Sequence, residues 1–313
     1  MRICLSTDPY HADFLRIAER LSPYAEVDTV GLDGFSLKGY DIVVARNLNA
    51  DKLETADKLK AVFSYKTGVD DFPIKELLTR GIPLYNSHGN SKAIAEFALA
   101  LAFSITARTA YYDRKMRVGD WAGSDPSWKS LFSMRVGLAG YGHIGKAVND
   151  LLKRNGIATY TVERGGVYNA IATVPSLEEL CKTCDLIISS LPKTENTEKI
   201  FDAQIFSDMK GKYFVNVGRG SVVDEDALYE ALTQGGMAGA AIDTWCTKPV
   251  CDNVVFYPFS RPFHTLENVV LSSHKAMQVN DGFERYAEDT VQNVLRFLRG
   301  EPMPPAVDCK KGY

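Results

Sequence analysis

Apolar and polar positions alternate along the chain in two patterns that follow each other repeatedly. Short apolar runs at residues 2–6, 41–45 and 61–65 have the length and composition of buried β-strands. Stretches such as residues 12–21 and 50–59 carry apolar side chains every three to four positions, which is typical of amphipathic helices. Strands that alternate with helices in this way predict an α/β protein with a parallel sheet covered by helices on both faces.

The alternation occurs in two series. The first fills about the first 90 residues and leads into a long helical pattern over residues 91–116. The second begins near Val136 and continues to about residue 280, and an amphipathic helix over residues 284–300 and a proline-rich tail follow it. At roughly 150 residues per domain, a length of 313 residues also suggests two domains.

The composition is that of an ordinary globular protein, with 45% hydrophobic residues, 24% charged residues and a formal net charge of −3. Without a basic surplus, we expect neither a nucleic-acid partner nor a membrane partner. No apolar run is long enough to cross a bilayer and no signal segment begins the chain, so a cytoplasmic location is expected. Six cysteines are too few for a disulfide scaffold, and the C-x-x-C pair Cys181 and Cys184 is expected to be a pair of buried or half-buried thiols.

A glycine-rich turn joins a strand to a helix at the start of the second series. Gly140, Gly142 and Gly145 have the G-x-G-x-x-G spacing. The first glycine permits a tight turn, the second lets the backbone approach a pyrophosphate, and the third lets helix and strand pack closely. The helix begins near His143 and Ile144, where backbone N–H groups stabilise an anion. This context predicts a dinucleotide-binding site.

The identity of the dinucleotide depends on the end of the next strand. Glu163 stands there, eighteen residues after Gly145, where a carboxylate binds the ribose hydroxyls of NAD. Arg164 follows directly and would face the 2′-phosphate of NADP, which Glu163 would repel. Because the acidic residue occupies the strand end, NAD is the expected cofactor and NADP the less favoured alternative.

Three further strands of the second series are each followed by a side chain suited to chemistry. Arg219 stands between two glycines, Asp243 ends the segment AGAAID, and His274 ends the segment NVVLSSH. In an open α/β sheet the ligand crevice lies outside the carboxyl ends of the strands, so all three belong where a ligand would bind.

With these residues in place, the sequence resembles the D-2-hydroxyacid dehydrogenase family over nearly its whole length. The resemblance is carried by GVDDFP at 68–73, RGIPLYNSHGNSKAIAEFAL at 80–99, VGLAGYGHIGKAV at 136–148, SLPKTENT at 190–197, VNVGRGSVVDEDAL at 215–228, AAIDTW at 240–245 and NVVLSSH at 268–274.

The resemblance implies a fold class of two doubly wound parallel-sheet domains with the active site in a cleft between them. One would be a flavodoxin-like substrate domain formed by residues 1–92 and 288–313, because the C-terminal helix returns to it. The other would be a Rossmann NAD domain formed by residues 93–287. A homodimer through the NAD domain is implied, with residues 119–131, including Trp121 and Trp128, as part of the dimer arm.

The resemblance also implies a reaction, in which a hydride passes between C4 of the nicotinamide and C2 of a 2-keto or 2-hydroxy acid. Arg219 would bind the substrate carboxylate and polarise the keto oxygen, and His274 would be the general acid and base. Asp243 would lie near the nicotinamide carboxamide, with Pro192 as another cofactor-binding residue. Backbone N–H groups of Thr67, Gly68 and Val69 would hold the substrate carboxylate. No metal is expected, since arginine replaces zinc as the group that polarises the carbonyl.

One position departs from the family pattern. The family usually carries a glutamate five residues after the aspartate, where it orients the catalytic histidine and raises its pKa, but this chain has Lys248. A charged lysine beside His274 would lower the histidine pKa and could not accept its ring N–H.

Three interpretations remain open. Lys248 faces solvent while Asp252, Cys246 or a backbone carbonyl orients His274, and the protein is an ordinary 2-keto acid reductase. Alternatively, Lys248 binds a second anionic group of the substrate with support from Arg46, which follows a strand of the first series. In the third interpretation, catalysis is impaired and the protein is an NAD(H)-sensing module. The sequence does not name the 2-hydroxy acid.

Overall fold

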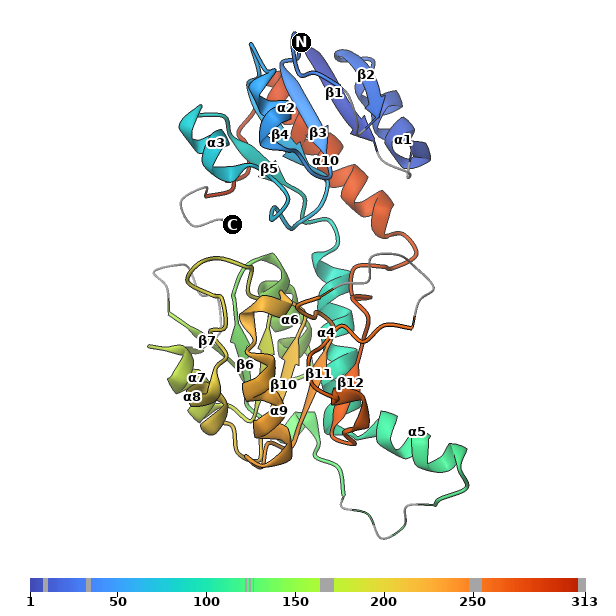
Figure 1. The fold of residues 1–313 in the computed structure, drawn as a ribbon, viewed down its shortest axis with the longest axis vertical. Coiled ribbons are helices and arrows are strands. Elements are labelled where there is room, and N and C mark those ends of the chain that lie inside the picture. Colours follow the sequence, from blue (N-terminus) through green and yellow to red (C-terminus); the bar gives the residue numbers. More distant parts are fainter. Residues whose placement is uncertain are drawn as a thin grey trace. The chain divides into compact units, whose positions relative to one another are not determined.

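The structure is a computed structural model that describes residues 1–7, 11–31, 35–121, 123, 125, 127–163, 172–247 and 255–308. The chain divides into two compact units (Figure 1). Unit 1 consists of Met1–Asn90 and Asn280–Tyr313, and unit 2 consists of Ser91–Val279.

Unit 1 contains a five-stranded parallel sheet in the order β2-β1-β3-β4-β5. The strands are β1 (Arg2–Thr7), β2 (Glu26–Gly31), β3 (Ile42–Ala45), β4 (Ala61–Ser64) and β5 (Leu84–Asn86). The helices are α1 (His11–Leu21), α2 (Ala50–Glu54), α3 (Ile74–Thr79) and α10 (Gly282–Arg299). This strand order is that of flavodoxin-like sheets.

Helices cover both faces of the unit 1 sheet. Successive side chains of a strand point to opposite faces, so neighbouring residues of β4 contact different helices. Val62 packs into a core with Leu53 of α2 and Leu77 of α3. Its neighbour in β4, Phe63, meets the ring of Phe297 in α10 edge-on at 5.9 Å. Because helices cover both faces, every residue of β3 and β4 is buried, which explains why these strands are continuous apolar runs with a single serine at the end of β4.

Asp41 ties β1 to β3 at the start of the strands. Its carboxylate accepts the backbone N–H of Arg2 at 2.9 Å and pairs with Lys60 at 2.9 Å and Lys58 at 3.3 Å. The Arg2 N–H, followed by the two lysines, lowers the pKa of the Asp41 carboxyl to about 2 despite burial. The side chain is 9% exposed, so it is an internal anchor of this edge.

Unit 2 contains a seven-stranded parallel sheet in the order β12-β11-β10-β9-β6-β7-β8. The strands are β6 (Val136–Ala139), β7 (Thr159–Val162), β8 (Ala172–Val174), β9 (Leu186–Ser189), β10 (Tyr213–Asn216), β11 (Gly239–Ile242) and β12 (Val269–Leu271). The helices are α4 (Ser91–Thr106), α5 (Thr109–Arg117), α6 (His143–Arg154), α7 (Leu177–Thr183), α8 (Ala203–Ser207) and α9 (Glu225–Thr233), with 3-10 turns η1 (Leu131–Ser133), η2 (Gly220–Val222) and η3 (Phe263–Thr265).

Two separate apolar cores lie on the two faces of this sheet. One packs α4 and α6 against the sheet, and the other packs α7, α8 and α9 against the opposite face. The second core contains Cys181 and Cys184, which are fully buried, and burial raises the pKa of both thiols to about 12. The two sheets confirm the expected class of two doubly wound parallel-sheet domains, and the two cysteines are the expected buried thiols.

The prediction of a single helix over residues 91–116 is wrong. It is two helices, α4 and α5, which meet at an angle of 61°. Arg108 lies between them with a φ of 55°, and this left-handed conformation breaks the ladder of helical hydrogen bonds. Among the described residues no single helix is long and apolar enough to span a bilayer; α4 and α5 together meet that criterion by length and composition only.

The second division between the units also lies earlier than the sequence suggested. The expected boundaries followed residues 92 and 287, whereas the units divide after Asn90 and after Val279. The reason is that α10 is one continuous helix, and it packs against α1 and β4 of unit 1 over its length.

Candidate active site

The glycine-rich turn connects β6 to α6. Gly140 has a φ of 100°, and Gly142 caps the helix that begins at His143. A Cβ on Gly145 would lie 2.1 Å from the carbonyl oxygen of Gly140, so only glycine fits there. A Cβ on Gly142 would meet none of the described residues within 4 Å, so this backbone position has room for a ligand. This geometry fits a dinucleotide: the third glycine serves packing, and the second serves close approach.

The turn lies where the strand order of the unit 2 sheet reverses. β6 is flanked by β7 on one side and by β9 on the other. Ser190, which follows β9, donates its hydroxyl to the carbonyl oxygen of Gly140 at 3.3 Å. In doubly wound sheets this switch point is where ligands bind. Helix α6 begins at His143 and Ile144, directly after this turn, so its N-terminus lies at the switch point.

Two other predicted cofactor-binding residues lie at the same sheet edge. Glu163 directly follows β7, donates its backbone N–H to Val174 of β8 at 2.9 Å and has an exposed side chain. Pro192 follows β9, and its carbonyl oxygen accepts the Thr197 hydroxyl at 2.7 Å. Arg164 lies outside the described residues.

Arg219 stands on a turn that the preceding strand builds. The fully buried Asn216 ends β10, accepts the N–H of Gly218 at 3.1 Å and donates to the carbonyl oxygen of Arg219 at 3.0 Å. On the other side, a Cβ on Gly220 would lie 2.1 Å from the backbone of Trp245. The backbone around Arg219 is therefore fixed from both sides. Asn216 was not anticipated as a functional residue, although its place at the strand end could have indicated a turn-building role.

Asp243 builds the turn that carries His274. It is fully buried, and its carboxylate accepts the Ser272 hydroxyl at 2.5 Å and the backbone N–H groups of Lys275 at 2.8 Å and Ala276 at 3.2 Å. Its carbonyl oxygen accepts the His274 N–H at 2.8 Å. His274 itself has a φ of 60°, a conformation that is costly for a non-glycine residue. The carboxylate thus stabilises a strained turn that presents the histidine.

The strands that precede these residues are neighbours. β10, β11 and β12 are adjacent, so the turns with Arg219, Asp243 and His274 come together at the carboxyl edge of unit 2, the edge that also carries the glycine-rich turn. Trp245 links two of these turns, because its indole N–H donates to the Ser272 carbonyl oxygen at 2.9 Å. Neither Ser272 nor this contact was anticipated, since the partners are 27 positions apart.

Position 248 and Asp252 lie outside the described residues, but Cys246 is described. Its backbone N–H donates to Glu225 at 3.3 Å. Although the residue is exposed, partial desolvation of its thiol and the Glu225 carboxylate raise the pKa of the thiol to about 12. Cys246 therefore stands as a partner of Glu225 in this structure, rather than as a thiolate available for chemistry.

The predicted substrate loop belongs to unit 1 and follows β4. The Thr67 hydroxyl donates to the Ser87 carbonyl oxygen at 2.8 Å, and Asn86 donates to the Thr67 carbonyl oxygen at 2.7 Å, so the loop with Gly68 and Val69 is fixed to the end of β5. The neighbouring side chain of Lys66 pairs with Asp71 at 2.5 Å and is 18% exposed.

Arg46 directly follows β3 and is half-buried. Because β3 and β4 are adjacent, Arg46 lies at the same edge of the unit 1 sheet as the loop of residues 67–69. Among the described residues, no group of three or more His, Cys, Asp or Glu side chains is arranged to hold a metal ion.

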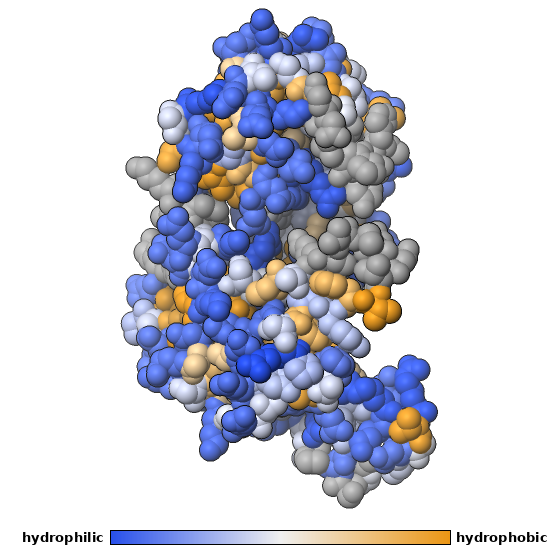
Figure 2. Space-filling view, in the orientation of Figure 1, coloured by the Kyte–Doolittle hydropathy of each residue, from blue (hydrophilic) through white to orange (hydrophobic). Residues whose placement is uncertain are grey.

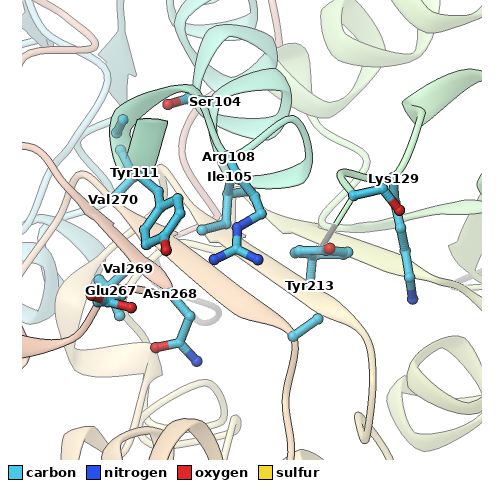
Figure 3. A pocket seen from close by; sticks show the side chains of 13 residues that line it. Ser104, Ile105, Arg108, Tyr111, Lys129, Tyr213, Glu267, Asn268, Val269 and Val270 are labelled. Atoms are coloured by element: carbon cyan, nitrogen blue, oxygen red, sulfur yellow. The ribbon is translucent and has the colours of Figure 1, made fainter. Parts of the chain in front are cut away.

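A separate cavity of 240 Å³ lies in unit 2 where α4 meets α5. Figure 3 shows Arg108 pointing into it between Tyr111 and Tyr213, with Lys129 beside them. The guanidinium of Arg108 lies 4.2 Å from the centre of the Tyr111 ring, a cation–π arrangement.

Comparison with known proteins identifies a family and several similar proteins. Residues 99–276 match the family described as D-isomer specific 2-hydroxyacid dehydrogenase, NAD binding domain. A glyoxylate reductase of Korarchaeum cryptofilum is 33% identical over 275 residues, which cover 83% of this chain and 80% of that protein. A D-3-phosphoglycerate dehydrogenase of Methanocaldococcus jannaschii is 28% identical over 311 residues, which cover 95% of this chain and 57% of that protein. The crystal structure of the PH0520 protein of Pyrococcus horikoshii matches with a TM-score of 0.86 at 27% identity, over 98% of this chain and 95% of that one.

Proposed function

The chain belongs to the D-isomer specific 2-hydroxyacid dehydrogenase family, and from that premise we propose that it interconverts a 2-keto acid and a D-2-hydroxy acid with NAD. The observation that most supports the proposal is the common sheet edge. The turns that hold Arg219 and His274 end β10 and β12 on either side of Asp243, at the edge that carries the glycine-rich turn.

Two side chains carry the substrate chemistry in this proposal. The planar guanidinium of Arg219 binds the substrate carboxylate through paired hydrogen bonds and polarises the keto oxygen. His274 donates a proton to that oxygen during reduction and removes it during oxidation. The bound nicotinamide supplies the hydride that C2 receives. We also propose that backbone N–H groups of residues 67–69 bind the substrate carboxylate.

We propose NAD rather than NADP as the cofactor. Glu163 supports this choice, because its exposed carboxylate directly follows β7 and would repel a 2′-phosphate. The glycine-rich turn and the start of α6, with His143 and Ile144, would hold the pyrophosphate. Pro192 completes the proposed cofactor-binding set. Asp243 was expected to belong to this set, but in this structure it is fully buried and its carboxylate is bonded to Ser272, Lys275 and Ala276. If Arg164 bound the 2′-phosphate of NADP instead, the enzyme would have a lower KM for NADPH than for NADH.

The role of Lys248 differs between an ordinary reductase and a module that senses NAD(H), and a third possibility, binding of a second anionic group, concerns the substrate. An ordinary reductase, with Lys248 in solvent and Asp252, Cys246 or a backbone carbonyl orienting His274, is favoured because Arg219, Asp243 and His274 are all retained. A binding module that senses NAD(H) would have no physical need for all three. The lysine in place of an acid is the one observation that favours the module.

The substrate class is a small 2-keto acid. One relative is named a glyoxylate reductase, and a short 2-keto acid of that kind needs only the carboxylate contacts assigned here. Another is named a D-3-phosphoglycerate dehydrogenase. A substrate with a second anionic group would be bound by Lys248 with Arg46.

The test is oxidation of NADH with a panel of 2-keto acids across about pH 5 to 9, with NADPH in parallel. We expect turnover with at least one keto acid and an acidic optimum, because no glutamate at position 248 raises the pKa of the histidine. Arg219→Lys should lose turnover and keep NADH binding, and His274→Ala should abolish turnover. Lys248→Glu should raise the pH optimum of an ordinary reductase, but should selectively lose anionic substrates if Lys248 binds them. NADH binding without turnover of any keto acid would favour the sensing module.

We also propose a homodimer through unit 2. Large apolar side chains are exposed at the end of α5 and on the segment after it: Met116 is 53% exposed, Trp121 82%, Trp128 55% and Phe132 62%. In Figure 1, α5 and this segment project from the rest of unit 2, and Figure 2 shows a small hydrophobic patch on the otherwise hydrophilic surface of this projection. Light scattering should give twice the mass of the chain, and Trp121→Ser with Trp128→Ser should lower it.

A further inference from the structure

Glu225 joins two parts of the chain that are far apart in sequence. It is the first residue of α9, and each of its carboxylate oxygens has its own partners. One oxygen accepts the backbone N–H of Cys246 at 3.3 Å. The other accepts the backbone N–H of Ser260 at 3.2 Å and its hydroxyl at 3.4 Å. One carboxylate therefore bridges the two ends of the segment of residues 246–260.

Two other contacts bring these ends together. The Thr247 hydroxyl donates to the carbonyl oxygen of Pro258 at 2.6 Å, and the rings of Trp245 and Phe259 lie 4.8 Å apart. The two described ends of the segment therefore lie side by side. Residues 248–254 lie outside the described residues, so the inference uses only these two ends.

The first end of the segment touches both turns assigned to substrate chemistry. The backbone of Trp245 lies so close to Gly220 that an added Cβ would be 2.1 Å away, and Gly220 is the neighbour of Arg219. The indole of Trp245 donates to Ser272, two residues before His274. A displacement of the peptide between Trp245 and Cys246 would therefore displace the turns that carry Arg219 and His274.

We propose that Glu225 is a positioning residue, which bridges Cys246 and Ser260 and thereby holds the turns of Arg219 and His274 in place. This inference rests on the proposed function for its kinetic consequence, but not for the structural bridge. The carboxylate suits the task because it offers an acceptor to each end. The amide of a glutamine offers one acceptor, and its NH₂ group would face an N–H donor at the other end.

The chain offers a matched control at the next position. Asp226 is also acidic, also in the first turn of α9, and pairs with Arg261 at 2.6 Å, directly after Ser260. Asp226→Asn removes a negative charge from the same helix end, with the same effect on the helix dipole. It leaves the bridge between Cys246 and Ser260 intact.

The first measurement is backbone hydrogen exchange by mass spectrometry on peptides that cover residues 243–247 and 258–262. In Glu225→Gln, at least one of these peptides should exchange about tenfold faster than in wild type. The peptide around His274 should also exchange faster. Asp226→Asn should exchange like wild type in residues 243–247. Unchanged exchange in Glu225→Gln would overturn the proposal, whatever the activity of the protein.

The second measurement is keto acid reduction over the same pH range. Glu225→Gln should lose about tenfold or more in kcat, with a displaced pH profile, while the dissociation constant for NADH stays as in wild type and in Asp226→Asn. Faster exchange with an unchanged kcat and pH profile would overturn the positioning role. A wild-type protein without turnover of any keto acid would refute the proposed function, and exchange would still decide whether Glu225 forms the bridge.

Discussion

The turn that carries His274 depends on one buried carboxylate, so Asp243→Asn is the most informative single change. Asparagine has the shape of aspartate but only one acceptor oxygen. If that oxygen keeps the Ser272 hydroxyl and the Lys275 N–H, the new NH₂ group faces the N–H of Ala276, which now lies 3.2 Å from the second oxygen. A buried N–H without an acceptor costs about 1–3 kcal/mol.

The two contacts that remain also weaken, because hydrogen bonds to a carboxylate are roughly twice as strong as those to a neutral acceptor. Together these effects should reduce the free energy of unfolding by about 2–3 kcal/mol. In a unit of this size about 1 kcal/mol shifts the unfolding temperature by roughly 2–4 °C, so a decrease of about 4–12 °C is expected. The strained φ of His274 should then relax, with a loss of kcat.

The assay is thermal unfolding followed by circular dichroism, together with steady-state kinetics. Ser272→Ala is the control, because it removes one of the three donors and leaves the carboxylate with both N–H groups; it should cost about 1 kcal/mol. If Asp243→Asn unfolds at the wild-type temperature and turns over at the wild-type rate, the carboxylate does not stabilise the histidine turn.

Other single contacts lead to similarly specific expectations. Gly145→Ala should lower the unfolding temperature because its Cβ would lie 2.1 Å from a backbone oxygen, whereas Gly142→Ala should spare it and weaken NADH binding in a fluorescence titration. Asp41 has a pKa of about 2 against an ordinary 3.8, so it contributes about 2 kcal/mol above about pH 4, and this stability is lost as the pH falls toward 2. Acid unfolding should show the advantage of wild type over Asp41→Asn shrinking in that window. Trp245→Phe keeps the ring but loses the donor to Ser272, so kcat should fall at constant NADH affinity; an unchanged kcat would contradict this link.

The sequence was sufficient to predict the fold class, since buried strands and amphipathic helices have different periods and alternate without interruption. It also located the glycine-rich turn, whose spacing reflects local packing between Gly145 and Gly140. The break between α4 and α5 could not be predicted in this way. Arg108 adopts a left-handed conformation without a glycine or proline nearby, and the helical pattern continues through it. Only the packing of the two helices decides that conformation.

The side chains proposed to act on substrate stand at strand ends, where sequence reasoning looks for them. The residues that position them contact partners far along the chain and carry no local signal. Asp243 contacts partners 29 to 33 positions away, and Glu225 contacts partners 21 and 35 positions away. A sequence pattern therefore indicates which groups could act, while the structure is needed to find what holds them.

The same distinction bears on the lysine that replaces the usual acid. Position 248 lies in the sequence between Cys246 and Ser260, the two residues that Glu225 bridges, so we expect any action of Lys248 on His274 to depend on that bridge. The two substitutions Lys248→Glu and Glu225→Gln should then be non-additive. Lys248→Glu should move the pH profile strongly in the wild-type background and weakly when Glu225 is glutamine. Equal displacements in both backgrounds would mean that the charge at position 248 reaches His274 independently of the bridge, and that the two positions affect the histidine by separate routes.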